Sequence, residues 1–144
     1  MFFSGSTQLK VWFTTVAVIL AVVQLMTALR MYGRISFPAV TPPWFGDLHR
    51  LSGTTAFIFT LPVAYICLWT FGFNGGASDA RTLIHSVLGC LFYGALAAKI
   101  FVIRKKSGPA WALPVLGGTV FTILIGLFLT SAVWFWSDSG FPSF

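Results

Sequence analysis

The sequence predicts an all-α integral membrane protein, a bundle of four transmembrane helices, and three observations lead to this fold class. Hydrophobic residues make up 57% of the chain and charged residues only 8%, whereas about a quarter of the residues in soluble domains are charged. The mean hydropathy is +0.88. Four apolar runs each approach the roughly 20 residues that a membrane-spanning helix needs. The 144 residues are therefore expected to form a single transmembrane domain, 1–144, without a separate soluble domain.

The apolar runs place the expected helices, in chain order, at 11–32, 48–73, 81–104 and 110–136. These runs must be helices because the backbone in lipid has to satisfy its own hydrogen bonds. The first run is too long for the apolar region of a cleaved signal peptide, and no small-residue cleavage site follows it. The apolar runs themselves cover 11–29, 51–73, 82–103 and 110–136, and Lys99 is the only charged residue in them. We expect Lys99 to extend its amine toward the interface.

The connections between the helices differ in length and composition. Residues 31–48 hold three prolines and a tryptophan and are expected to lie along the membrane interface. Residues 74–81 are rich in glycine and predict a tight turn, so the second and third helices are antiparallel. Ser78 or Asp79 is expected to cap the third helix, and Asp47 the second.

Basic residues are concentrated at one end of the predicted bundle. That end carries Arg30, Arg34, Arg50, Arg104, Lys105 and Lys106, whereas the other end carries Lys10 and Arg81. The positive-inside rule makes the first end cytoplasmic, which predicts a multi-pass protein of the cytoplasmic (inner) membrane with both termini outside. The net charge of +6 is accounted for by this topology and by anionic lipid, so no nucleic-acid partner is expected.

No autonomous catalytic site is visible in the sequence. The carboxylates Asp47, Asp79 and Asp138 all fall in loops or at helix ends, where no pair can carry out acid–base chemistry inside the membrane. Cys67 and Cys90 form no CxxC or CxxCH motif and are expected to be free, small apolar residues.

Both histidines of the chain stand in the same pattern, His-x-x-x-Gly: His49 precedes Gly53, and His85 precedes Gly89. Residues four apart share one helix face, so each glycine leaves open space beside an imidazole. Neutral imidazoles inside a membrane bundle are good axial ligands for haem iron. The sequence therefore predicts His85 and His49 as tetrapyrrole ligands. Solvated or packing roles are the alternative.

The predicted topology separates the two rings. His49 opens the second helix at the cytoplasmic end, and His85 lies about one turn into the third helix at the outer end. With a rise of about 1.5 Å per residue, their depths differ by about 20–25 Å. One haem iron cannot bind both imidazoles of the same chain. Each site therefore needs a further ligand or holds a five-coordinate iron. His85 is the better candidate because it lies within the bundle, while Arg50 beside His49 is expected to neutralise a haem propionate.

Several motifs then point to a known type of protein. They are HRxSG at 49–53, LPVAY at 61–65, HSxLGCxFYGxxAAK at 85–99, SAxWF at 131–135 and the terminal GFPxF. From Leu48 to Phe144 the chain resembles a family of small bacterial membrane proteins similar to cytochrome b561-type electron carriers. The resemblance implies haem b, electron transfer and a Rieske iron–sulfur partner. One position departs from the pattern, since Ile66 stands where a further histidine is expected.

The leading interpretation is a membrane-embedded, b-type cytochrome-like electron-transfer subunit of a larger redox complex, such as one of a respiratory chain. A haem-free accessory subunit of a respiratory or photosynthetic complex is the first alternative. A pigment-binding subunit is the second, because the magnesium of a chlorophyll is satisfied by one histidine. All three interpretations predict other membrane subunits and lipid as partners, because small residues on the third helix, such as Gly94 and Ala97, favour close helix packing.

Overall fold

The protein is an all-α bundle whose four long helices are each long and apolar enough to span a membrane, which confirms the predicted fold class. The structure is a computed structural model that describes residues 6–71, 80–106 and 108–140, and no strand occurs among them. In chain order the elements are α1 (Ser6–Met31), α2 (Phe45–Ile66), η1 (Cys67–Phe71), α3 (Ala80–Lys105), α4 (Ala112–Phe128), η2 (Leu129–Val133) and α5 (Trp134–Ser139). The η elements are π-helical segments, and η2 joins α4 to α5 in one continuous span.

The expected cap of the second helix is wrong. α2 begins at Phe45 with Trp44 at the N-cap and without a side-chain cap bond. Asp47 lies inside the first turn, where its carboxylate is 3.4 Å from the Arg50 guanidinium. Its negative charge also interacts favourably with the positive end of the helix dipole. The predicted caps of the third helix, Ser78 and Asp79, lie outside the described residues.

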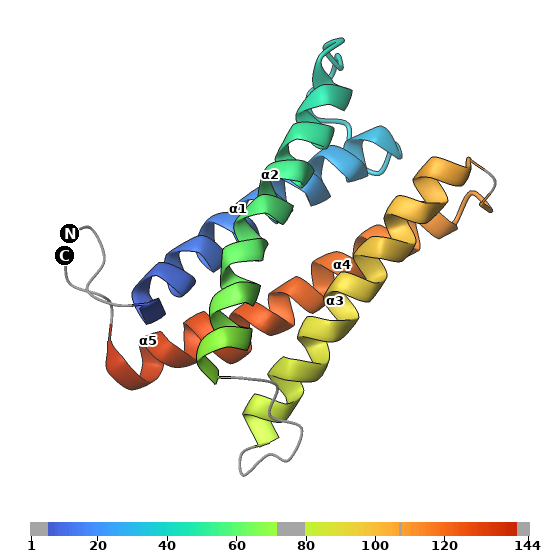
Figure 1. The fold of residues 1–144 in the computed structure, drawn as a ribbon. Coiled ribbons are helices and arrows are strands. Elements are labelled where there is room, and N and C mark those ends of the chain that lie inside the picture. The colour runs from blue at the N-terminus through green and yellow to red at the C-terminus, as the bar shows by residue number, and fades with distance from the viewer. Residues whose placement is uncertain (1–5, 72–79, 107, 141–144) are drawn as a thin grey trace.

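The four spans form two closely packed helix pairs (Figure 1): α1 lies along α2, α3 lies along α4, and α1 also contacts α4. The start of α1 and the end of α5 lie at the same end of the bundle. α2 and α3 approach each other less closely than the helices within either pair, and side chains join them. Tyr93 on α3 donates a hydrogen bond to the Thr60 carbonyl of α2 over 3.1 Å, and its ring packs edge-on against Phe57.

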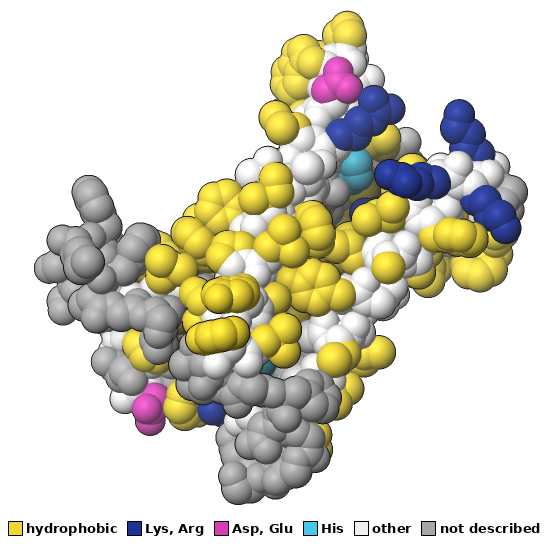
Figure 2. Space-filling view, viewed as in Figure 1, with side chains coloured by type: hydrophobic (Ala, Val, Ile, Leu, Met, Phe, Trp, Pro, Cys, Tyr) yellow, Lys and Arg dark blue, Asp and Glu magenta, His cyan; other side chains and the backbone are white. Residues whose placement is uncertain are grey.

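Small residues bring the helices together, while large apolar side chains face outward. Ala17 and Ala132 are fully buried, and a central cluster forms where Ala21, Phe92 and Leu124 meet. Many large side chains are exposed, and Figure 2 shows them over much of the visible surface. This distribution is expected in a membrane, because lipid solvates apolar side chains and tight packing depends on small residues.

Removing the hydroxyl of Tyr93 should loosen the contact between the two helix pairs. We expect Tyr93→Phe to lower the free energy of unfolding by about 0.5–1 kcal/mol, the range of interhelical hydrogen bonds in membranes. Denaturation in mixed detergent micelles, followed by circular dichroism, measures this change. Tyr32→Phe is the matched control, since Tyr32 is exposed after α1. Equal losses from both variants would contradict the assigned bond.

Candidate functional site

His85 is held in one tautomer by a threonine from the adjacent helix of its own pair. The ring lies near the start of α3, and its Nδ1 is 2.8 Å from the Thr130 hydroxyl in η2. That hydroxyl is also 2.8 Å from the Gly126 carbonyl, to which it donates its proton. The Thr130 oxygen therefore accepts the Nδ1 proton of His85. Nε2 then carries an unshared electron pair, which is the form of imidazole that binds a metal.

The π-helical segment η2 positions Thr130. A π-helical turn shifts the backbone out of the usual helical register, and such turns are frequent at functional sites. In η2 the Trp134 amide bonds to the Ser131 carbonyl, and the Thr130 carbonyl accepts a hydrogen bond from Arg81 over 3.0 Å. The Arg81 guanidinium also lies 3.8 Å from the centre of the Trp134 ring. Thr130 is thus fixed by both its carbonyl and its hydroxyl.

His85 lines two adjoining cavities. The larger, about 340 Å³, has a mainly apolar wall contributed by all four spans, and its volume is near the lower end of the ~300–1,000 Å³ typical of ligand pockets. The smaller, about 210 Å³, contains Lys10 and Arg81. The side chains common to both cavities are Cys67, His85, Ser86 and Ser131. The histidine therefore lies between an apolar chamber and a cationic one.

The space beside Gly89 is open, as the His-x-x-x-Gly pattern led us to expect. A Cβ atom at this position would meet nothing within 4 Å, and Gly89 lines the larger cavity together with His85. The glycine therefore leaves room for a bound molecule beside the ring.

His49 is held in the same way at the other end of the bundle. Its Nδ1 is 2.7 Å from the Thr27 hydroxyl of α1, and this hydroxyl is 2.8 Å from the Val23 carbonyl. By the same reasoning Thr27 accepts the Nδ1 proton and Nε2 keeps its electron pair. Each histidine thus has a threonine from the adjacent helix of its own pair, α1 for α2 and α4–η2 for α3.

The two glycines differ in their surroundings. A Cβ atom at Gly53 would lie 2.9 Å from Oε1 of Gln24, so that side chain takes the space that the sequence interpretation left for a macrocycle. The Gln24 amide donates hydrogen bonds to the His49 carbonyl and, over 2.8 Å, to the Ser52 hydroxyl. Gly53 is therefore a packing glycine that admits a polar link between α1 and α2.

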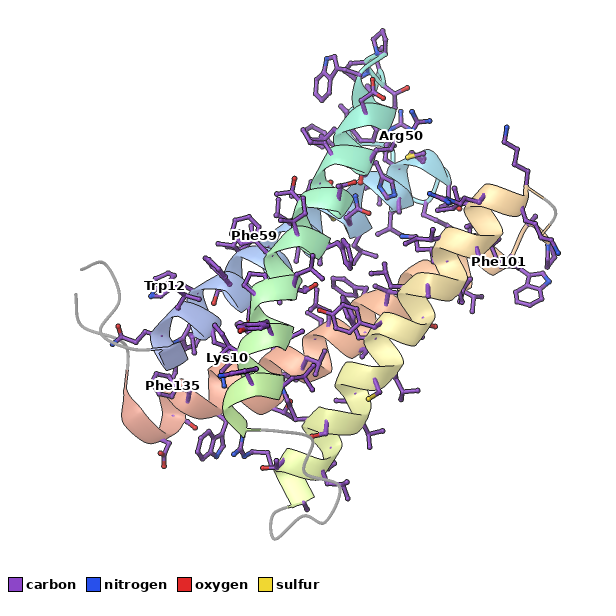
Figure 3. All side chains as sticks on the ribbon, in the orientation of Figure 1. Lys10, Trp12, Arg50, Phe59, Phe101 and Phe135 are labelled. Carbon is purple, nitrogen blue, oxygen red and sulfur yellow. The ribbon has the colours of Figure 1, made fainter. Side chains whose placement is uncertain are left out.

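Two charged side chains at this end, Arg50 and Lys99, were singled out in the sequence. Arg50 is exposed and pairs with Asp47 on its own helix, and Figure 3 places it at the opposite end from Lys10. Lys99 is half-buried, and its Nζ lies 4.0 Å from the position of a Cβ on Gly117 of α4.

Comparison with protein families adds one finding. A family model, described as a family of unknown function (DUF6529), matches residues 1–143. The chain belongs to this family. No curated protein and no solved structure matches the chain. No function is assigned to the DUF6529 family, so membership gives no role to particular residues of this chain.

Within this DUF6529 chain, α2 and η1 contribute one wall of the larger cavity. Tyr65 and Trp69 stack on each other with ring centroids 6.0 Å apart and are 64% and 79% exposed. The cavity wall on this side includes Ala64 and Cys67, whereas Ile66 is absent from the lining of both cavities. The sequence interpretation did not single out Thr130. The run 110–136 also holds Thr119, Thr122 and Ser131, so nothing in the local sequence distinguishes Thr130.

Proposed function

We propose that the chain is a membrane-embedded, b-type cytochrome-like electron-transfer subunit that binds one haem b in the outer cavities through Nε2 of His85. The observation that supports this most strongly is the hydrogen bond of Nδ1 to Thr130, because it leaves Nε2 unprotonated and fixes the ring. Histidine ligands of metals commonly donate their other nitrogen proton to an oxygen in this way, which orients the ring and raises its basicity.

The residues around His85 fit such a group. Gly89 keeps one side of the ring open, and the larger cavity provides apolar surface for a macrocycle. Lys10 and Arg81 line the smaller cavity and suit the carboxylates of a haem. In this proposal Lys10 and Arg81 neutralise the haem propionates. The sequence interpretation gave that role to Arg50, which lies at the other end of the bundle.

When bound, haem supplies one-electron redox chemistry, and the chain controls its surroundings. Thr130 keeps the ligand nitrogen aimed and unprotonated, and the apolar wall excludes water. The charges of Lys10 and Arg81 favour the reduced group and raise its potential. With the arginine-rich end in the cytoplasm of a bacterium, the site faces the outer side, where the proposed Rieske iron–sulfur partner would exchange electrons.

A pigment-binding subunit is the second candidate. Among the described residues His85 is the only histidine that lines the two cavities, and a chlorophyll-type magnesium needs one protein ligand. The two candidates differ in redox behaviour, since a pigment of this kind is not expected to cycle between two stable oxidation states in a mild titration.

A potentiometric titration tests the electron-transfer role. The protein, purified in mild detergent with its co-purifying partners, should show a haem absorbance that is reduced and reoxidised reversibly. We expect a one-electron transition, with about 59 mV for each tenfold change in the ratio of oxidised to reduced forms. A tetrapyrrole absorbance that does not respond to potential would favour the pigment candidate and contradict the proposal.

A further inference from the structure

The end of the bundle opposite His85 contains a lysine at an unusual place. Lys99 lies six residues before the end of α3 at Lys105, or about 9 Å along the helix at a rise of about 1.5 Å per residue. It is half-buried against α4 beside Gly117. Within residues 6–71, 80–106 and 108–140, no hydrogen bond or ion pair involves its amine. An unbalanced charge at this depth is unfavourable and usually marks a site.

The described part of the chain provides no anion for Lys99. Asp47 is exposed and pairs with Arg50 at 3.4 Å, and Asp138 lies at the far end of the fourth span. The neighbouring side chains instead add positive charge, because Arg104 and Lys105 occupy the last turn of α3. This region therefore favours an anion from outside the chain.

The surface at this end has the shape of a lipid site. α2 and α3 are not closely packed, and the start of α2 stands well apart from the end of α3 (Figure 1). The space-filling view shows a notch between them with Lys and Arg side chains on its walls, and apolar side chains continue below it (Figure 2). Basic notches between spans above apolar surface suit a charged headgroup and its acyl chains.

We propose that this notch binds the phosphate of an anionic phospholipid, with the Lys99 amine as its principal contact and the exposed Arg50 and Arg104 as further cations at the same end. This inference is independent of the haem proposal. A haem propionate is a poorer occupant, because Gln24 fills the space beside Gly53 where a macrocycle would have to lie.

Lipid titration of the detergent-solubilised full chain tests the site. The midpoint of thermal unfolding is measured against increasing phosphatidylglycerol, phosphatidylcholine or inorganic phosphate. The wild-type midpoint should rise with phosphatidylglycerol and much less with phosphatidylcholine. Inorganic phosphate alone should have little effect, because the acyl chains contribute to binding; a comparable rise with phosphate would contradict a lipid site. Lys99→Met should weaken the apparent affinity for phosphatidylglycerol about five- to tenfold, the effect expected when one lysine that contacts an anionic headgroup is lost.

Lys106→Met is the matched control, because Lys106 is exposed at the same end, whereas Lys99 is half-buried. If Lys99 makes the principal contact, Lys106→Met should change the apparent affinity for phosphatidylglycerol by less than about twofold. Without anionic lipid, Lys99→Met should be at least as stable as the wild type, since it removes an unbalanced charge. Equal gains from phosphatidylglycerol in the wild type and in Lys99→Met would overturn the proposal, as would equal losses in both variants. If Lys99→Met does not fold, Lys99→Gln is compared in the same way; failure of both to fold would also contradict it.

Discussion

Replacing His85 with alanine is expected to remove nearly all haem absorbance from the purified protein. The variant loses the nitrogen that would bind iron, while the cavity, Gly89 and Thr130 remain in place. Because the ring is half-buried in a roomy site, the bundle itself should still fold. The measurement is the Soret absorbance for each mole of chain, with circular dichroism to verify the helical content.

Two further variants separate ligation from folding. His49→Ala removes an equivalent imidazole whose neighbouring space is filled by Gln24, so it should leave most of the Soret band intact. Thr130→Val keeps the shape of the side chain but removes the acceptor of the Nδ1 proton, and it should weaken haem binding about 10- to 100-fold, as is typical of partners that orient a metal ligand. Retention of the Soret band in His85→Ala, with its loss in His49→Ala, would reverse the assignment.

Enlarging Gly53 should destabilise the fold far more than enlarging Gly89. In Gly53→Val the new side chain meets Gln24, which must move and lose its bonds to Ser52 and the His49 carbonyl. We expect a loss of about 1–3 kcal/mol in the free energy of unfolding, the usual effect of overpacking. Denaturation in mixed micelles measures it.

Gly89→Val is the matched control, because it makes the same chemical change at the same place in the second motif. Its side chain enters open space, so the free energy of unfolding should change little, while the narrowed cavity should reduce haem binding. Similar destabilisation by both substitutions would show that helix propensity, and not the Gln24 contact, determines the effect.

The fold could be predicted from the sequence because lipid leaves few choices. An uncharged run of sufficient length must be a helix, and the four runs became four spans. Helix ends were less predictable: α2 starts three residues earlier than expected and places Asp47 inside its first turn. Nothing in the local sequence marks Trp44 as an N-cap, since it makes no side-chain cap bond there.

The candidate site was only partly predictable for a different reason. His49 with Gly53 and His85 with Gly89 have identical spacing, yet one glycine faces Gln24 and the other an open cavity. The difference comes from the neighbouring helix, which the spacing within one helix cannot reveal. Thr130 is likewise recognisable only after folding, because it lies 45 positions from His85 in the chain.

The most direct test is the tetrapyrrole content of the purified wild-type protein, measured by extracting the pigment and recording its absorption spectrum. If His85 is the ligand and Gln24 closes the second site, the extract should contain one haem b for each chain. Two haems for each chain, a magnesium pigment, or no tetrapyrrole would contradict the proposal.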